Sequence, residues 1–164
     1  MNTIEARLYV GTYAKYNNSS LVGAWLDLTD YTSAEDFYIA CAELHKDESD
    51  PEFMFQDFEG FHKSLYDESG NIDAIYEYLK ECASLSQDIV NAGLDCEIQL
   101  ASIESAYYGE YESDLDFAYN YIDDTGFLSD VPESIIRYFD YEAYAKDLSY
   151  DFTSSNGYYF SNNY

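Results

Sequence analysis

A chain of 164 residues is long enough for one ordinary domain or for a few very small ones. Its 33 Asp and Glu residues face only 7 Lys and Arg residues, which gives a formal net charge of −26. Seven scattered cations exclude the basic patch that a nucleic-acid-binding protein needs, and 20 Tyr and 10 Phe residues argue against a disordered acidic tail, which would be poor in aromatics.

The first part of the chain predicts a small α/β unit. Segments rich in β-branched, apolar and aromatic residues favour strands, and the polar residues 16–20 favour a turn between the first two. Thr32 or Ser33 can cap a helix whose first turn is acidic. The expected order is strand, strand, helix, strand, over residues 6–13, 21–28, 33–45 and 52–59.

The middle of the chain predicts helices. Asn71 can cap a helix over residues 72–85, which carries apolar side chains at helical spacing. A second, short helix over residues 88–93 is expected to end at Gly93, because glycine commonly follows the last helical turn. The next segment, 94–105, favours helix over strand.

The last part of the chain predicts a second α/β unit. A strand over residues 106–111 precedes a helix that Ser113 can cap and that Gly126 can end. Another helix is expected to begin at 131–133, and Asn156-Gly157 is a turn pair typical of a hairpin. The inward face of the first helix is expected to carry Leu115, Ala118, Tyr119 and Ile122.

Together these elements predict an α+β fold built from three small domains. The expected domains are an N-terminal α/β domain (1–60), a helical middle domain (61–105) and a C-terminal α/β domain (106–164). Units of this size bury little surface individually, so each is expected to lean on its neighbours.

Negative charge is the most informative feature of the sequence. Between Glu81 and Ile136 there are 13 acids and no Lys or Arg. Duplex DNA carries one charge per roughly 1.7 Å of its axis, so a net charge of −26 corresponds to about 44 Å of duplex. A compact globule of this length would be on the order of 40 Å across. The charge per unit length is therefore close to that of DNA.

Two interpretations of this charge stay open. An anionic binding surface would offer its carboxylates to a cationic partner, whereas a merely solvated surface, as in halophilic or very soluble proteins, would serve solubility alone. The tyrosines that alternate with the acids fit both interpretations, because a Tyr ring packs in a core or at its rim and is also enriched at interfaces.

Catalytic and metal-binding patterns find little support. Residues 67–78 contain acids, but Ile72 and Tyr78 stand where a calcium-binding EF-hand loop needs Gly and Glu. Cys41 and His45 lie four residues apart on the predicted helix, and without a second pair a buried thiol and a surface histidine explain them better than a metal site. We expect no enzyme activity and no cofactor.

The cysteines and the apolar runs bear on location. Cys41, Cys82 and Cys96 show no paired spacing, so we expect no disulfide framework, and a reducing cytoplasm fits best. The longest apolar run is far short of the roughly 20 residues that span a bilayer, and residues 1–7 lack the features of a secretory signal. The sequence thus predicts a cytoplasmic protein that binds neither membranes nor nucleic acid.

Two blocks of the sequence carry a family resemblance. The first is YNNSSLVGAW at 16–25, and the second comprises YIDDTG at 121–126, VPES at 131–134 and YFDYEAY at 138–144. In order, spacing and overall length, these blocks resemble the ArdA antirestriction proteins of conjugative plasmids and transposons. The middle third, residues 61–105, matches only in acidity and helical character.

The resemblance implies an elongated, curved homodimer that mimics bent B-form DNA. Such proteins occupy the DNA groove of type I restriction-modification enzymes, and the methyltransferase core is the expected partner. The resemblance implies no catalytic residues, and an acidic surface that tolerates substitution. Two alternatives stay open: a mimic directed at another DNA-binding or phage-defence protein, and a general acidic interaction protein without mimicry.

The candidate site residues fall into two sets. The carboxylates that we expect to stand in for phosphates are Glu97, Glu104, Glu110, Glu112, Asp114, Asp116, Asp123, Asp124, Asp130, Glu133, Asp140, Glu142 and Asp147. The residues that the resemblance implies at or near a contact between two copies are Gly126, Val131, Pro132, Tyr138, Tyr141 and Tyr144.

Overall fold

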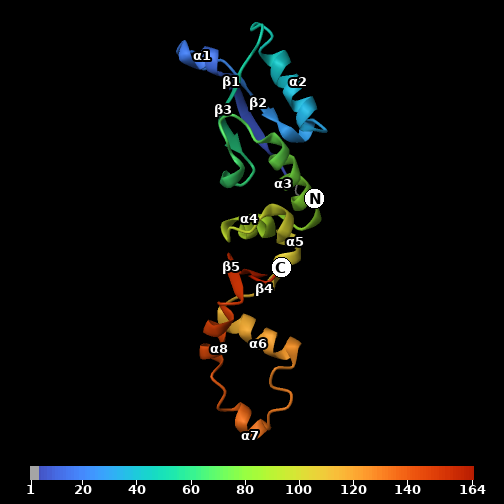
Figure 1. Cartoon of the computed structure of the whole chain (residues 1–164), viewed down its shortest axis with the longest axis vertical. Helices are drawn as coiled ribbons and strands as arrows, with labels where there is room; N and C mark the ends of the chain where they lie inside the picture. Colours follow the sequence, from blue (N-terminus) through green and yellow to red (C-terminus); the bar gives the residue numbers. More distant parts are fainter. Residues whose placement is uncertain (1–3) are drawn as a thin grey trace. The chain divides into compact units, whose positions relative to one another are not determined.

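The computed structural model describes residues 4–164, which form two compact units (Figure 1). The N-terminal unit ends at Gln87 and the C-terminal unit runs from Asp88 to Tyr164. Helices and strands are mixed in both units, which confirms the α+β prediction. The finer division into three domains stays a prediction.

The elements follow one another along the chain with short connections. The strands are β1 (Arg7–Thr12), β2 (Ala24–Asp27), β3 (Phe53–Glu59), β4 (Tyr107–Glu110), β5 (Phe152–Ser155) and β6 (Tyr158–Ser161). The helices are α1 (Tyr13–Asn17), α2 (Ala34–Leu44), α3 (Ile72–Ser84), α4 (Gln87–Asp95), α5 (Ile103–Ala106), α6 (Asp114–Thr125), α7 (Glu133–Ile136) and α8 (Tyr141–Leu148). Short 3₁₀ turns lie at Leu28–Asp30, Lys63–Leu65 and Leu100–Ser102.

Three antiparallel strands form the sheet of the N-terminal unit, in the order β2-β1-β3. All three lie within the segments predicted for them. α2 also begins where predicted, because the Ser33 side chain accepts a hydrogen bond from the Asp36 backbone N–H. This helix lies along one face of the sheet, where the rings of Phe37 and Phe55 pack with their centroids 6.2 Å apart (Figure 1).

The connection between β1 and β2 differs from the predicted turn. α1 begins directly after β1, because Thr12 Oγ1 accepts a hydrogen bond from the Lys15 N–H and caps a helical turn. The chain reverses only after this helix, where Ser19 adopts a left-handed φ of 58°. The prediction of a turn over 16–20 was therefore wrong for its first residues.

His45 is buried, not on the surface as predicted. Its Nδ1 lies 2.8 Å from Lys15 Nζ, and its Nε2 lies 3.1 Å from the Val10 carbonyl oxygen. Because an ammonium group can only donate, Nδ1 must accept and Nε2–H must donate to the carbonyl. A hydrogen bond from Lys15 to Asp47, at 2.9 Å, raises the pKa of Lys15. The histidine thus closes a polar network between α2 and the first strand.

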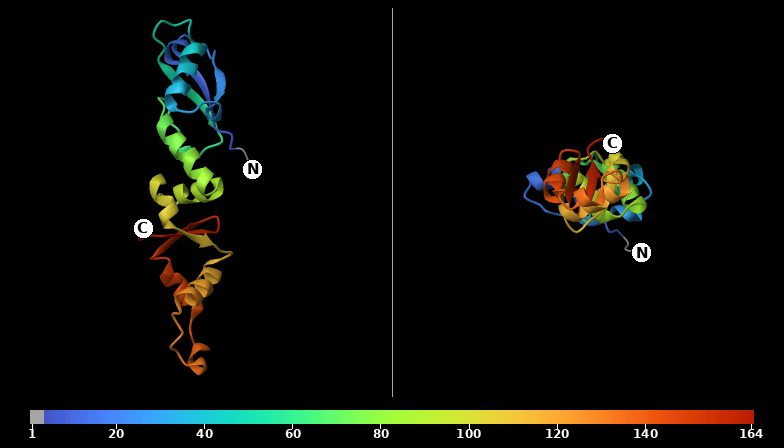
Figure 2. Two further views of the ribbon diagram at one scale, coloured as in Figure 1. Left: turned by 90° about the vertical axis from the view of Figure 1, so that its right-hand side faces the viewer. Right: turned by 90° about the horizontal axis from the view of Figure 1, so that it is seen from below.

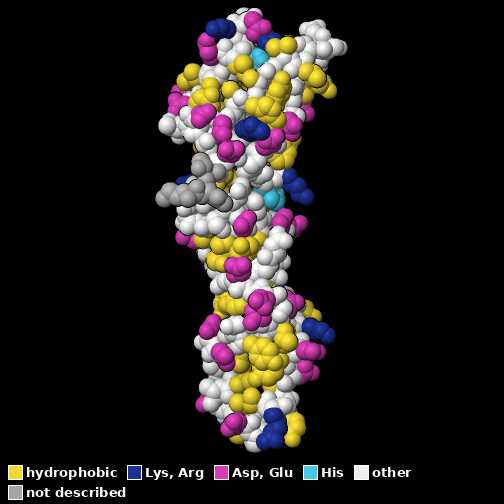
Figure 3. All heavy atoms as spheres, turned by 180° about the vertical axis from the view of Figure 1, so that it is seen from behind, with side chains coloured by type: hydrophobic (Ala, Val, Ile, Leu, Met, Phe, Trp, Pro, Cys, Tyr) yellow, Lys and Arg dark blue, Asp and Glu magenta, His cyan; other side chains and the backbone are white. Residues whose placement is uncertain are grey.

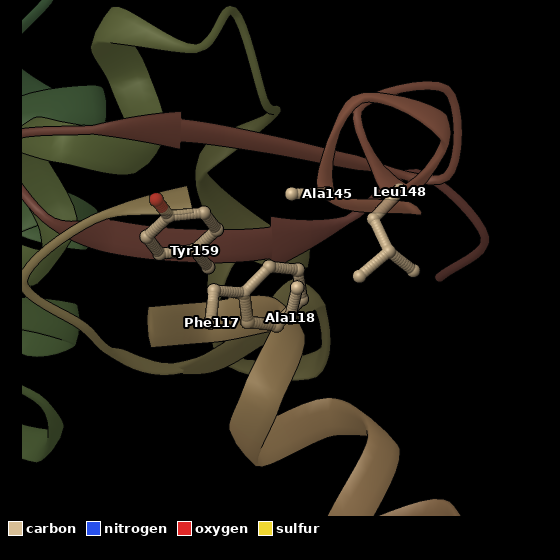
Figure 4. Packing of buried hydrophobic residues seen from close by; sticks show 5 residues of the cluster. All are labelled: Phe117, Ala118, Ala145, Leu148 and Tyr159. Carbon is tan, nitrogen blue, oxygen red and sulfur yellow. The ribbon is translucent and has the colours of Figure 1, made fainter. Parts of the chain in front are cut away.

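The sheet of the C-terminal unit is antiparallel, in the order β4-β6-β5. β5 and β6 form the predicted hairpin, and Asn156 and Gly157 have φ values of 53° and 86°, the left-handed conformations that such a two-residue turn requires. α6 and α8 lie on the same side of this sheet (Figure 2). The core between them comprises Phe117, Ala118, Ala145, Leu148 and Tyr159 (Figure 4).

The inward face of α6 differs in part from the prediction. Phe117 is buried and stacks on Tyr159, with ring centroids 4.5 Å apart. Tyr119 was expected to face inward but is 47% exposed, and it stacks on Tyr141 of α8 at 4.4 Å. Ala118 and Ile122 are buried as predicted, and Phe117 takes the place expected for Tyr119 because its ring packs against Tyr159 of β6.

Two other predicted features of the C-terminal unit need correction. α4 continues past Gly93 to Asp95, and Gly93 is buried within the helix. Glycine suits this position because any Cβ would lie 2.9 Å from the Ile103 side chain. Residues 94–105 are helical only in part, since a regular α-helix resumes only at Ile103. By contrast, the ends of α6 are as predicted: Ser113 caps it, and Gly126 ends it with a left-handed φ of 65°.

Buried and half-buried tyrosines predict how the fold responds to alkali. Burial raises the pKa of Tyr76 from 10.0 to about 12, and burial together with a 2.6 Å hydrogen bond to Asp114 raises the pKa of Tyr159. A tyrosine whose pKa is higher in the folded state stabilises the fold below its unfolded pKa, and this contribution is lost as pH rises through the folded value. Each ionisation also adds negative charge to an acidic chain.

We therefore expect cooperative unfolding between about pH 10 and about pH 12. Tyrosinate absorbance and circular dichroism, followed through an alkaline titration, should change together. Tyrosines that titrate as a group near pH 10.0 while the fold stays intact would contradict the prediction.

Candidate anionic interface

The predicted phosphate-like carboxylates all lie in the C-terminal unit, and all are exposed except the half-buried Asp116. On the face drawn in Figure 3, Asp and Glu side chains are scattered over this part of the chain among apolar patches, with few Lys or Arg. They occupy the link after α4 (Glu97), α5 (Glu104), β4 (Glu110), the link to α6 (Glu112), α6 (Asp114, Asp116, Asp123, Asp124), the loop before α7 (Asp130), α7 (Glu133), the N-cap of α8 (Asp140) and α8 (Glu142, Asp147).

Cations within the C-terminal unit leave this charge largely uncompensated. The unit holds 16 acids against Arg137 and Lys146. Among residues 4–164, neither of these two cations makes a salt bridge, and Arg137 lies over the ring of Tyr138, 5.9 Å from its centroid. In the N-terminal unit, by contrast, three of the cations pair with carboxylates. Most of the charge of the C-terminal unit is thus available to a cationic partner.

Three of these carboxylates are held in place by hydrogen bonds. Asp114 accepts one from the Tyr159 hydroxyl at 2.6 Å, and Asp140 accepts one from the Ala143 N–H at 3.0 Å. Asp116 accepts two at 3.1 Å, from a backbone N–H and from an amide side chain of neighbouring residues. Side chains that are already ordered lose less conformational entropy on binding. These three carboxylates are therefore ordered before any partner binds.

Two other acids oppose local helix stability. Asp123 and Asp124 lie in the last turn of α6, where the helix has no basic residue. The negative end of the helix dipole there disfavours a carboxylate, at a cost of up to about 1 kcal/mol each at an exposed site. Residues that weaken their own element without a compensating contact are often kept for function. Their position favours the interpretation of a binding surface over one of simple solubility.

The residues predicted to contact a second copy lie between the end of α6 and α8. They are Gly126, Val131, Pro132, Tyr138, Tyr141 and Tyr144. Tyr138 is 79% exposed and lines, with Val131, an open apolar groove of about 360 Å³. Tyr144 is half-buried and stacks on Phe127 at 4.9 Å, so this tyrosine packs within its own chain.

Sequence reasoning missed two exposed apolar residues at this groove: Ile135 lines it, and Phe127 packs against Phe139, which also lines it. Phe127 and Ile135 are 54% and 56% exposed. Neither lies in a segment with a regular hydrophobic period, since Phe127 follows the end of α6 and Ile135 lies in the single-turn helix α7. The sequence signal that could have found Phe127 and Ile135 is the group of apolar residues between α6 and α8, a stretch too short to bury its own apolar side chains.

The residues considered for other chemistry have structural partners. Burial raises the pKa of the Cys41 thiol to about 12, and His45 makes the network described above. In residues 4–164, no group of three or more His, Cys, Asp or Glu side chains is arranged to hold a metal ion. Over the same residues, no helix combines the length and the apolar character that crossing a membrane requires.

Comparison with known proteins gave one family match. A family model described as "Antirestriction protein (ArdA)" matches residues 8–160. The matched span covers nearly the whole chain, including both blocks of sequence that carry the resemblance and every carboxylate of the candidate interface. The search of curated proteins gave no match.

Proposed function

We propose that this chain, which belongs to the ArdA family of antirestriction proteins, inhibits type I restriction-modification enzymes by occupying their DNA-binding groove. In this proposal the exposed carboxylates of the C-terminal unit take the place of DNA phosphates. The single observation that supports it most strongly is the set of exposed acids on that unit, with only Arg137 and Lys146 among them.

The spacing of acids on α6 is compatible with a duplex. Asp116 and Asp123 are seven residues apart, so they lie on the same face of the helix, about 10 Å from one another along its axis. Successive phosphates on one DNA strand rise by about 3.4 Å along the axis, so this separation corresponds to roughly three base pairs. A partner whose cations contact phosphates roughly three base pairs apart on one strand can therefore contact both carboxylates.

Such a mechanism is independent of the enzyme's target sequence. Phosphate contacts position a protein on DNA, whereas base contacts in the grooves read the sequence. A surface of carboxylates offers partners for the first kind of contact and none for the second. The proposed inhibitor should therefore act on type I enzymes that recognise different sequences.

We also propose that the active form is a homodimer in the cytoplasm. The groove lined by Val131, Ile135 and Tyr138, with the exposed Phe127 packed against its lining residue Phe139, supports a contact between two copies near α7. Burial of these apolar side chains would stabilise the contact. A stable contact needs roughly 800 Å² from each partner, so residues beyond the groove must take part.

A gel-shift competition tests the proposed function. A type I methyltransferase core is bound to labelled DNA, and this protein is added at increasing concentration. We expect the enzyme–DNA complex to disappear, for enzymes of different sequence specificity alike. Polyglutamate at the same concentration of carboxylates serves as the control for charge without fixed geometry. An enzyme–DNA complex that survives a large excess of the protein would show that the proposed target is wrong.

A further inference from the structure

The two most exposed aliphatic side chains of the N-terminal unit are adjacent in the sequence. Leu21 is 66% exposed and Val22 is 64% exposed, in the segment that leads into β2. Single exposed aliphatic residues are ordinary, but contiguous apolar surface on an otherwise charged protein is typical of a contact site. The carboxylates of the candidate interface lie in the other unit, so they do not account for these residues.

An aromatic pair extends this apolar surface onto the sheet. Tyr9 of β1 lies opposite Trp25 of β2, and their rings meet edge to face at 5.6 Å. The Tyr9 hydroxyl donates a 2.9 Å hydrogen bond to the Leu21 carbonyl oxygen, which fixes the loop against the ring. Gly23 allows this approach, since a Cβ there would lie 2.2 Å from the Val10 carbonyl oxygen. Tyr9, Leu21, Val22 and Trp25, which this ring pair and this hydrogen bond bring near one another, are here called the β2 patch.

Charges beside the β2 patch indicate the kind of partner. The register of the sheet places Asp57 opposite Tyr9, and Glu59 opposite Arg7, and both acids are exposed. The Arg7 guanidinium pairs with Glu59 and lies 5.0 Å from the Trp25 ring centroid. Arg7 thus already compensates the charge of Glu59 and occupies a face of the ring. Among residues 4–164, no salt bridge engages Asp57.

A second copy of this chain is a poor occupant of the β2 patch. A contact between two identical faces would bring Asp57 of one copy towards Asp57 of the other, in a chain of net charge −26. A protein surface that carries arginine or lysine around an apolar centre complements both Asp57 and the aliphatic side chains.

We propose that the β2 patch is a second contact site, which binds an apolar protein surface bordered by Arg or Lys on the enzyme that the protein inhibits. This inference rests on the proposed function. It adds to DNA mimicry a contact that DNA itself does not make: the anionic interface competes for the groove, and the β2 patch holds protein against protein. Burial of apolar surface does not depend on counterion release, so its share of the affinity should persist at high salt.

The test is the double variant Leu21→Ser/Val22→Ser in the gel-shift competition, at several salt concentrations. Both side chains are exposed, and neither substitution changes the charge. We expect competition about tenfold weaker than that of the wild type at every salt concentration, with the same slope of log affinity against log salt. The matched control is Ile39→Ser, which removes an aliphatic side chain that is 62% exposed on α2, outside the patch. It should compete like the wild type.

The outcomes separate this inference from the proposed function. If wild-type protein fails to displace DNA, the proposed function is wrong and the inference falls with it. If the wild type competes and the double variant competes equally well, only the inference is wrong. An equal loss in Ile39→Ser, a change of the salt slope, or a change of the oligomeric state in size-exclusion chromatography would also overturn it. Thermal unfolding of both variants checks that the fold is intact.

Discussion

Raising the salt concentration from about 50 to about 200 mM should weaken the complex with a type I methyltransferase core by on the order of 10³-fold, the lower end of the range for proteins that contact six to ten phosphates. The proposed interface consists almost wholly of carboxylates, most of them exposed and without a cationic neighbour of their own. The enzyme's Lys and Arg side chains would bind these groups as they bind phosphates. Added salt screens such contacts and competes for the same cations.

The measurement is a titration of affinity against salt, with duplex DNA bound to the same enzyme as the reference. Similar slopes of log affinity against log salt for the protein and for DNA would indicate that both engage the same cations. A slope near zero for the protein would contradict mimicry, since the affinity would then come from apolar contacts or from another site. The gel-shift competition could still succeed in that case, through a surface other than the acids.

Sequence predicted the local structure where one short motif determines an element. Ser113 followed by acids predicted the start of α6, and Asn156-Gly157 predicted the hairpin, because the cap and the turn each depend on neighbouring residues only. His45 was misplaced because its burial depends on Lys15 and Val10, which lie 30 and 35 residues away. Contacts at that separation leave no periodic pattern in the sequence.

In the candidate interface, too, some features could be predicted from the sequence and others could not. The exposure of its acids was predictable, because charged side chains are almost never buried unless paired. The ordering of Asp114 was not predictable, since it is fixed by a tyrosine hydroxyl 45 residues away. The β2 patch was missed for a related reason. Leu21 and Val22 have the composition of a strand interior, and only the start of β2 at Ala24 shows that they lie outside the strand.

Neutralising four acids of the C-terminal unit should weaken binding by about a hundredfold and lower the salt slope by as much as four, roughly one for each charged contact that is lost. The proposed variant is Glu110→Gln/Glu112→Gln/Asp123→Asn/Asp124→Asn. All four side chains are exposed, so the substitutions remove no buried contact. Any one of these substitutions alone should change affinity by about threefold, because the surface acts through many similar contacts.

The same variant should be more stable than the wild type. Its two substitutions in the last turn of α6 remove carboxylates from the negative end of the helix dipole, which should stabilise the helix by about 0.5 kcal/mol for each residue. Weaker binding by a better-folded protein cannot be attributed to unfolding. A rise in the thermal midpoint together with a loss of competition would show that these acids are retained for the interface at the expense of the fold.

A matched variant decides whether position or total charge matters. Asp50→Asn/Glu52→Gln/Glu68→Gln/Glu77→Gln removes the same number of exposed acids from the N-terminal unit. If placement matters, this variant should keep most of the affinity, since its acids lie outside the candidate interface. An equal loss in both variants would show that the enzyme responds to net charge and would refute the assignment of the interface to the C-terminal unit. Binding that depends on placement, by contrast, requires that the fold hold its carboxylates at defined positions, which is the physical content of mimicry.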